Sequence, residues 1–192
     1  MIAETLIRAA LVTTLGLGAG AAQAQFKLTS PDFTPGGKLH DEQAFDSFGC
    51  TGRNISPALE WSGVPKDAKS FALLVHDPDA PTGGAGWWHW LVYDIPAATT
   101  KLAKGAGKTD GSALPQGAAS AVTDYGKPGY GGPCPPEGDK PHRYVFTVHA
   151  LKTDKLDIPA DATAALAGFM INANAIGKAS FTAKYGRAKA KK

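Results

Sequence analysis

The chain has 192 residues and a formal net charge of +3 at pH 7, and 43% of its residues are hydrophobic. This length suits a single domain with a full core. Much of the positive charge lies near the C-terminus, and no basic stripe interleaved with aromatic residues occurs elsewhere, so we expect no nucleic-acid partner. The basic residues of this terminal segment are Lys184, Arg187, Lys189, Lys191 and Lys192.

Residues 1–24 have the features of a secretory signal peptide. Arg8 precedes an apolar run of small residues, and Ala22-Gln23-Ala24 has the small-x-small form of a signal-peptidase site. The run is too short and too rich in glycine to span a bilayer comfortably. We therefore predict a mature domain of residues 25–192 that is periplasmic or secreted, with an uncleaved amphipathic anchor as the alternative. No later apolar run is long enough to predict a transmembrane segment in the mature chain.

Several segments of the mature chain show strand patterns. Residues 26–29 alternate apolar and polar side chains, as a half-buried strand does. The continuous apolar run of residues 71–75 predicts a buried central strand. Residues 88–93 and 144–151 are rich in aromatic and β-branched side chains, which also favour strands.

Two long segments predict loops. Residues 31–53 are rich in turn-forming residues, and residues 97–141 are dense in Gly, Pro, Ser and Lys. A segment as long as the second one usually has a function or is mobile.

One helix is predicted near the C-terminus, with Asp161 as its N-cap and Gly177 as its stop. Apolar side chains follow at a 3.6-residue spacing and predict the buried face of this helix. They are Leu166, Phe169, Met170, Ala173 and Ile176. Residues 181–185 then alternate like a final strand. Many strands, one late helix and no βαβ rhythm predict a mainly β fold, an antiparallel β-sandwich-like single domain with a late α-helix.

The two cysteines, Cys50 and Cys134, both lie in the predicted exported part of the chain. An even count in an oxidising compartment favours a disulfide between them, and two free thiols are the alternative. Neither cysteine has further metal ligands at a suitable spacing, so we predict no metal site there.

Two motifs join rigid proline-containing backbone to polar side chains. The first reads Asp77-Pro78-Asp79-Ala80-Pro81 and is followed by Trp88-His89-Trp90 and Asp94-Ile95-Pro96. The second reads Gly132-Pro133-Cys134-Pro135-Pro136-Glu137-Gly138 and is followed by His142-Arg143-Tyr144. Because proline fixes φ, such loops hold polar groups with little ordering cost when a ligand binds. The motifs predict two walls of one anion-binding pocket.

Together with Asn54-Ile55-Ser56-Pro57, these motifs resemble the signature regions of the phosphatidylethanolamine-binding protein family, also called Raf-kinase-inhibitor-like proteins. The resemblance is strongest to the bacterial exported branch and covers essentially the whole mature chain. It implies a shallow pocket that binds a phosphorylated small molecule or a phospholipid headgroup, without catalysis and without a cofactor. The ligand-binding residues that it implies are Asp77, Asp79, Pro81, His89, Pro133, His142 and Tyr144.

The chain departs from the family pattern at His149, where the family often has tyrosine. The tyrosine that contacts the ligand near the family's C-terminus has no motif, and Tyr185 is the candidate here.

The chemistry of these residues agrees with the resemblance. Two aspartates beside a phosphate make sense if they fix His89 and His142 as hydrogen-bond donors, or if they accept from an ammonium group. Backbone N–H groups of residues 130–132 are further candidates for anion contacts. Such a pocket suits a zwitterion or a phosphomonoester better than a bare carboxylate. Structural interpretations stay open: the aspartates as turn formers, His89 as a core histidine and His142 as an exposed base.

Other classes of function compete with simple binding. Two aspartates and two histidines suit a metal-dependent hydrolase, although no metal-ligand spacing of the usual kind occurs. No Gly-x-Ser-x-Gly motif supports a serine hydrolase. A secreted protein that inhibits a kinase or a protease through surface contacts is the remaining alternative, with an unknown protein partner and a regulatory role.

Overall fold

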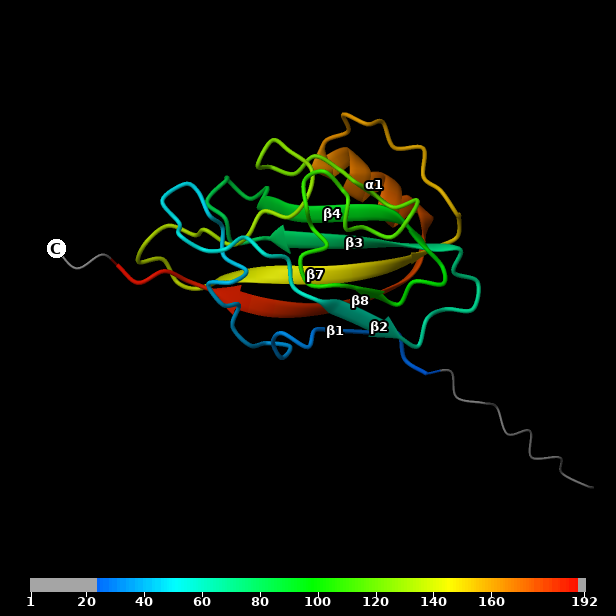
Figure 1. The fold of residues 1–192 in the computed structure, drawn as a ribbon, viewed down its shortest axis with the longest axis horizontal. Helices are drawn as coiled ribbons and strands as arrows, with labels where there is room; N and C mark the ends of the chain where they lie inside the picture. The colour runs from blue at the N-terminus through cyan, green and yellow to red at the C-terminus, as the bar shows by residue number, and fades with distance from the viewer. Residues whose placement is uncertain (1–23, 190–192) are drawn as a thin grey trace, which may run out of the picture.

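We describe the fold from a computed structural model, in which residues 24–189 are described. The fold is mainly β, as predicted, with two antiparallel sheets and one helix (Figure 1). The larger sheet has the strand order β6-β4-β3-β7-β8, and the smaller one has the order β1-β2-β5. The strands are β1 (Lys27–Thr29), β2 (Leu59–Ser62), β3 (Ser70–Asp77), β4 (Trp87–Pro96), β5 (Lys101–Leu102), β6 (Ala119–Ser120), β7 (His142–Leu151) and β8 (Ala175–Tyr185), and the helix is α1 (Ala164–Asn174).

The predicted signal peptide lies outside the described residues except for Ala24. Among the residues that the structure describes, no helix is both long enough and apolar enough to cross a membrane.

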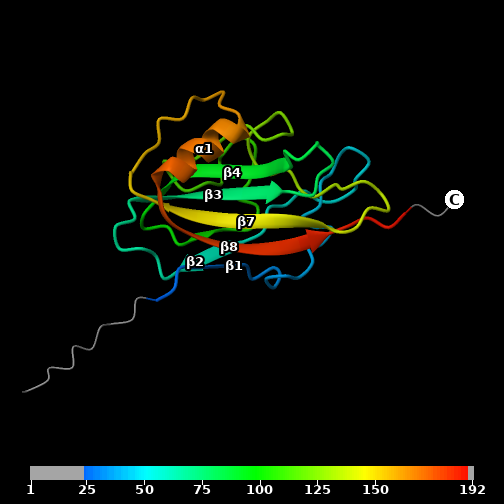
Figure 2. The ribbon, with the colours of Figure 1, turned by 180° about the vertical axis from the view of Figure 1, so that it is seen from behind.

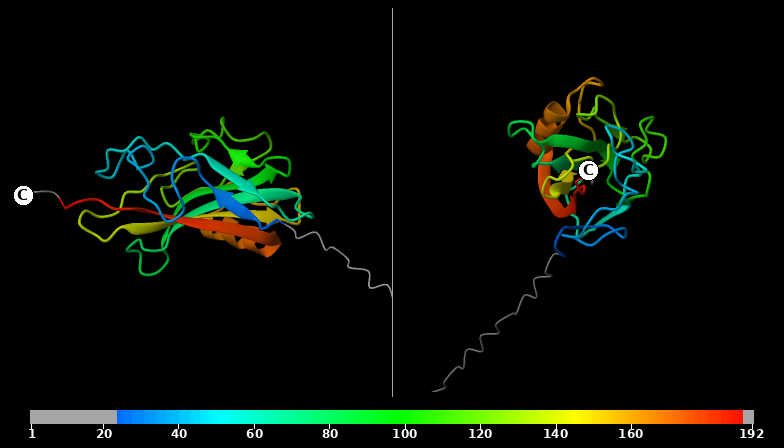
Figure 3. Two further views of the ribbon diagram at one scale, coloured as in Figure 1. Left: turned by 90° about the horizontal axis from the view of Figure 1, so that it is seen from below. Right: turned by 90° about the vertical axis from the view of Figure 1, so that its left-hand side faces the viewer.

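The main core lies between the two sheets. Phe146 of β7 and Phe181 of β8 stack with their ring centroids 5.1 Å apart, and Trp61 of β2 closes over the same cluster from the smaller sheet. A second cluster, which contains Leu74 and Ile171, lies between the larger sheet and α1. The smaller sheet and α1 therefore cover opposite faces of the larger sheet (Figure 3).

The strand predictions are confirmed and extended by the structure. The predicted segments 71–75, 88–93 and 144–151 lie inside β3, β4 and β7. β3 pairs with β4 on one side and with β7 on the other, so it is the central strand, and its side chains up to Val75 are buried. Within the predicted loop of residues 97–141, only the two-residue strands β5 and β6 are formed among the named elements.

The helix prediction was wrong in its cap, its buried face and its end. Thr163 is the N-cap, and its side chain accepts a hydrogen bond from the backbone N–H of Leu166. Phe169 is 70% exposed, whereas the buried positions are Ala164, Ala167, Gly168 and Ile171. Three of these four buried positions have small side chains, and α1 is in ordinary van der Waals contact with the sheet there. A Cβ atom at Gly168 would lie 3.8 Å from atoms of Leu74 and Trp88.

Gly177 does not end the helix. The backbone becomes extended at Ala175, and β8 starts at that residue. The predicted final strand of residues 181–185 is the second half of β8, which pairs with β7 along its whole length.

Candidate functional site

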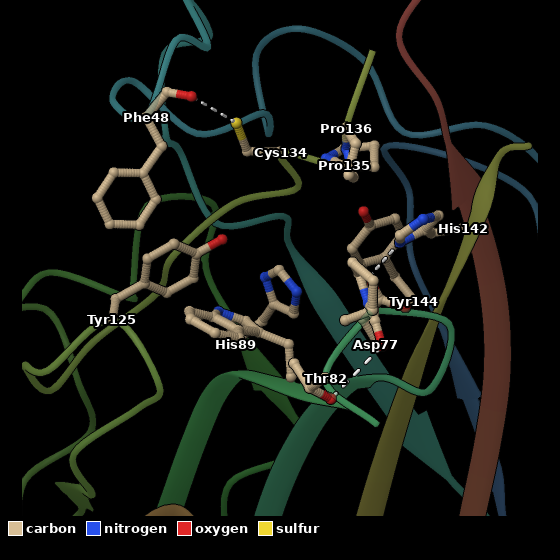
Figure 4. Close-up of a pocket in the computed structure, with 13 residues that line it drawn as sticks. Phe48, Asp77, Thr82, His89, Tyr125, Cys134, Pro135, Pro136, His142 and Tyr144 are labelled. Carbon is tan, nitrogen blue, oxygen red and sulfur yellow. Dashed lines mark hydrogen bonds and ion pairs between the residues drawn. The ribbon is translucent and has the colours of Figure 1, made fainter. Parts of the chain in front are cut away.

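A cavity of about 320 Å³ opens at one end of the larger sheet, where β3 ends and where β4 and β7 begin. Figure 4 shows side chains from both sequence motifs around this cavity, with Phe48 and Tyr125 on one side and Asp77, His142 and Tyr144 on the other. The lining residues are Phe48, Asp77, Ala80, Pro81, Thr82, Trp87, His89, Tyr125, Cys134, Pro135, Pro136, His142 and Tyr144.

Asp77 holds His142 in a fixed orientation. The Asp77 Oδ2 atom accepts a hydrogen bond from Nδ1 of His142 at 2.8 Å, and its Oδ1 atom accepts from the backbone N–H of Asp79 at 2.8 Å. Asp77 and His142 are both buried, at 3% and 5% exposure. Each carboxylate oxygen of Asp77 therefore has one hydrogen-bond partner within the protein.

Asp79 faces away from the cavity and forms an ion pair with Arg143. Its two oxygens accept hydrogen bonds from Nε and a terminal nitrogen of Arg143 at 2.9 and 2.7 Å, and from the Arg143 backbone N–H at 2.8 Å. These hydrogen bonds from Arg143 lower the pKa of Asp79 to about 2. Asp79 therefore ties the loop after β3 to the start of β7 and contacts neither pocket histidine through its carboxylate.

His89 reaches the cavity through an irregularity in β4. Val75 pairs with Trp90 while His76 pairs with Trp88, so His89 is the extra residue of a β-bulge. Bulges of this kind redirect a side chain away from the regular alternation of the strand. The His89 ring is almost fully buried, at 2% exposure, and lines the cavity beside Tyr144.

The hydrogen bonding of His89 fixes its chemical role. Nδ1 lies 2.6 Å from the carbonyl oxygen of Gly131 and must donate to it, because a carbonyl only accepts. Burial lowers the pKa of His89 to about 4, so the ring is neutral near pH 7. A neutral imidazole with its proton on Nδ1 has an acceptor at Nε2, and this buried atom has no partner among the described residues. The prediction that His89 serves as a donor to an anion does not fit this tautomer.

Tyr144 supplies a free hydroxyl beside His89. The two rings meet edge to face with centroids 5.1 Å apart, and the Tyr144 hydroxyl is buried without a hydrogen-bond partner in the described part of the chain. Burial raises the pKa of Tyr144, so its hydroxyl keeps its proton and can donate it in a hydrogen bond. The cavity is thus lined by two neighbouring side chains, His89 with an acceptor at Nε2 and Tyr144 with a donor hydroxyl.

An aromatic group forms the opposite wall. Phe48 is 70% exposed, has a positive φ of 55° and stacks on Tyr125 with ring centroids 5.9 Å apart. The Tyr125 hydroxyl donates to the carbonyl oxygen of Gly132 at 2.7 Å. Trp87 meets the Tyr125 ring edge to face. This wall offers mainly ring faces and edges to a ligand.

The second motif is held in place by a disulfide and by Asn54. The structure contains the Cys50–Cys134 disulfide, with Cα atoms 5.9 Å apart, which ties the loop of Phe48 to the cavity. The backbone N–H of Gly132 donates to Oδ1 of Asn54 at 2.8 Å, and that of Gly131 donates to the carbonyl of His89 at 2.9 Å. These N–H groups are therefore occupied, and the expected backbone contacts to an anion are not available.

The structure brings together most of the residues implied by the resemblance. Asp77, Pro81, His89, His142 and Tyr144 line the cavity. Asp79 and Pro133 do not line it, and the carbonyl of Pro133 instead accepts a hydrogen bond from Phe45.

Neither Tyr185 nor Asp94 lines the cavity. The Tyr185 hydroxyl donates to Asp41 at 3.0 Å. Asp94 of the first motif has a structural role, since it has a positive φ of 56° and accepts a hydrogen bond from the backbone N–H of Leu156. No group of three or more potential metal-ligating side chains that could hold a metal ion occurs within residues 24–189.

Sequence reasoning missed Phe48, Thr82 and Tyr125. Tyr125 lies in the long Gly- and Pro-rich segment, where no local pattern indicates a side-chain direction. The predicted Cys50–Cys134 disulfide ties the loop of residues 48–53 to the second motif, as the structure confirms, although the Phe48 side chain was not predicted to line the cavity.

Comparison with known proteins identifies the fold and its relatives. The family model described as phosphatidylethanolamine-binding protein matches residues 29–186. The UPF0098 protein YbcL of Escherichia coli K12 is 48% identical over 182 residues, which cover 95% of this chain and 98% of that protein. A crystal structure of E. coli YbcL, described as a member of the mammalian PEBP family, has a TM-score of 0.82 at 51% identity and covers 85% of this chain and 99% of that one.

Two more relatives extend this picture. The UPF0098 protein YbhB of E. coli K12 is 45% identical over 159 residues, which cover 83% of this chain and 99% of that protein. A Mycobacterium tuberculosis protein whose name describes it as a candidate lipoprotein, LppC, is 38% identical over 152 residues, which cover 79% of this chain and 68% of that protein.

Proposed function

This chain belongs to the phosphatidylethanolamine-binding protein family, and on that premise we propose that its cavity binds a phosphomonoester headgroup of the phosphoethanolamine type without converting it. The family is named for a phospholipid that carries phosphoethanolamine as a phosphodiester, whereas free O-phosphoethanolamine is the phosphomonoester. The observation that carries the proposal is that Nε2 of His89 and the hydroxyl of Tyr144 are both buried without a partner in one cavity, which Trp87, with a third such atom at Nε1, also lines.

The two atoms complement a phosphoryl group that retains one proton. Nε2 of neutral His89 accepts a hydrogen bond, so it requires a donor such as the P–OH group of a phosphomonoester monoanion. The Tyr144 hydroxyl donates to a charged phosphoryl oxygen, and hydrogen bonds to charged groups are the stronger ones. His142, oriented by Asp77, lines the same cavity as a third polar contact.

The charges around the cavity favour a ligand with both signs over a bare dianion. No lysine or arginine lines the cavity in the described part of the chain, and Asp77 contributes a negative charge. The aromatic wall of Phe48, Trp87 and Tyr125 suits an ammonium group or its methylenes, because ring faces attract cations. Phosphoethanolamine combines these features in one small molecule.

Binding without turnover is supported by the state of the nucleophiles that line the cavity. Cys134 is part of a disulfide. The Thr82 hydroxyl donates to the carbonyl oxygen of Gly86 at 3.0 Å. The Tyr144 hydroxyl remains protonated because burial raises its pKa. Each group therefore lacks the activation that nucleophilic catalysis needs.

We also propose that the protein is exported. The predicted signal peptide, the Cys50–Cys134 disulfide and the relative named as a candidate lipoprotein support this location. N-terminal sequencing of protein from the periplasmic fraction should give Gln25 as the first residue, and Met1 in that fraction would contradict the proposal.

Calorimetric titration with O-phosphoethanolamine tests the binding proposal. The variant Tyr144→Phe removes one hydroxyl that has no partner within the protein, so it should fold normally. We expect it to bind roughly 10- to 150-fold more weakly, which corresponds to the loss of about 1.5–3 kcal/mol for a hydrogen bond to a charged group. Tyr93→Phe is the matched control, because Tyr93 packs on the α1 side of the larger sheet, away from the cavity.

Two results would contradict the proposal in different ways. Equal affinity of wild type and Tyr144→Phe would place the site elsewhere. Release of inorganic phosphate or ethanolamine by wild type, and not by Tyr144→Phe, would show that the cavity is catalytic. A co-purifying protein that blocks the titration would instead support the inhibitor alternative.

A further inference from the structure

A second cavity, of about 250 Å³, lies on the outer face of the larger sheet and shares no lining residue with the first. Figure 2 shows that α1 covers the β4 side of this face and leaves β7 and β8 open beside it. The cavity is formed along this edge of α1. Its lining residues are Leu74, His76, Pro78, Trp88, Val145, Thr147, His149, Asn172 and Lys178.

His149 is a buried polar side chain that the fold does not use. It is 3% exposed, and its Nδ1 is buried without a hydrogen-bond partner among residues 24–189. Native proteins usually satisfy buried polar atoms, so a buried unpartnered imidazole calls for an explanation. This position is also where the chain departs from the tyrosine common in the family. Burial, together with the nearby Lys178, lowers the pKa of His149 to about 4, so its ring is neutral and offers one N–H donor.

Lys178 places a positive charge next to this imidazole. His149 of β7 and Lys178 of β8 are register partners on adjacent strands, and both line the cavity. Lys178 has no ion pair with any residue in the described part of the chain. An exposed lysine alone would be unremarkable, but here it is the cross-strand partner of a buried imidazole whose Nδ1 has no partner.

The other polar groups of this cavity already have partners. The hydroxyl of Thr147 bonds to that of Ser180 at 2.9 Å, and the Asn172 side-chain amide donates to the carbonyl of Gly168 at 2.7 Å. Nε2 of His76 lies 3.1 Å from the carbonyl oxygen of Ala85. Nδ1 of His149 and the ammonium of Lys178 therefore remain without a hydrogen-bond or ion-pair partner in the described part of the chain.

The rest of the lining is apolar. Leu74, Val145 and Trp88 form it, and the Trp88 ring packs against His76 with centroids 4.2 Å apart. Two donors beside an apolar surface match a planar anion with two oxygens and a hydrophobic body.

We propose that this second cavity binds a small carboxylic acid with an apolar body, with its carboxylate between Lys178 and the N–H of His149. Its apolar body packs on Trp88, Leu74 and Val145. The site is independent of the cavity at the end of the sheet and does not rest on the function proposed for that cavity.

Titration of the full mature chain with benzoate, followed by ¹H–¹⁵N NMR, tests this site. We expect chemical-shift changes centred on His149, Lys178 and the Trp88 indole. Lys178→Gln keeps the length of the side chain and removes its charge, and it should weaken benzoate binding by roughly 10-fold, as expected for loss of a hydrogen bond to a charged group. Lys66→Gln removes the same charge from another exposed position and should leave the affinity unchanged.

An uncharged analogue and two further variants test the role of charge and the location of the site. Benzamide has the same shape as benzoate and no charge, so it should bind more weakly to wild type. His149→Phe should also weaken benzoate binding, whereas Tyr144→Phe, in the first cavity, should not change it. The proposal is overturned if shifts appear only around the first cavity, if benzamide binds as well as benzoate, or if Lys178→Gln and Lys66→Gln have equal effects.

Discussion

The neutral state of buried His89 should make the folded protein sensitive to acid. The pKa of His89 is about 4 in the folded protein, against 6.5 for an ordinary histidine, because the ring is buried. Below pH 6.5 the unfolded chain therefore binds a proton that the folded chain does not. The free energy of unfolding must fall as the pH drops from 6.5 to 4, and above pH 6.5 this contribution is constant.

The size of the effect follows from the shift. One pKa unit corresponds to 1.36 kcal/mol, so His89 should reduce the free energy of unfolding by about 2–3 kcal/mol between pH 7.5 and pH 4.5. His89→Asn removes the titration and keeps an amide donor near the position of Nδ1, where it can still donate to Gly131. The acid-induced loss of stability should be smaller in this variant by that amount.

Urea denaturation of wild type and His89→Asn at both pH values measures the difference. Contributions from carboxylates and from His149 are common to both proteins and cancel in the comparison. His40→Asn, at an exposed position, is the control and should behave like wild type. If His89→Asn loses as much stability on acidification as wild type, His89 is not a neutral buried base and the donor–acceptor argument for the first cavity fails with it.

Three other predictions concern the framework of the site. Replacing Cys50 and Cys134 by alanine should lower the free energy of unfolding by about 4–5 kcal/mol, the value that the chain-entropy model gives for a separation of 84 residues. Urea titrations that show no change would contradict this. Gly132→Ala should lower both stability and phosphoethanolamine affinity, because a Cβ atom there would overlap the backbone of the neighbouring loop; an unaltered thermal midpoint would refute it. Asp79→Asn removes the charged partner of Arg143. The lowered pKa of Asp79 stabilises the fold above pH 3.8, and this stabilisation is lost as the pH falls toward 2. In acid titration the variant should therefore lose less stability than wild type across this pH range.

The sequence by itself determined the central strands of the larger sheet and several residues of the cavity. The apolar run of residues 71–75 and the aromatic, β-branched segments 88–93 and 144–151 needed only local patterns, because a buried strand must be apolar wherever it pairs. The two proline motifs placed Asp77, His89 and His142 at strand ends. Since antiparallel neighbours bring such ends together, the same patterns also brought these residues to one cavity.

Tertiary structure alone decided what each of these side chains does. Asp79 has the same local sequence signal as Asp77, yet it pairs with Arg143 because the turn between them points their carboxylates in different directions. The bulge at His89 and its bond to Gly131 depend on a pairing register and on a loop 42 residues away. The buried face of α1 was likewise decided by which side of the helix packs on the larger sheet, where Ala164, Gly168 and Ile171 are buried and Phe169 is not. Local patterns record which side chains avoid water, whereas hydrogen-bond partners and packing distances arise only when distant segments meet.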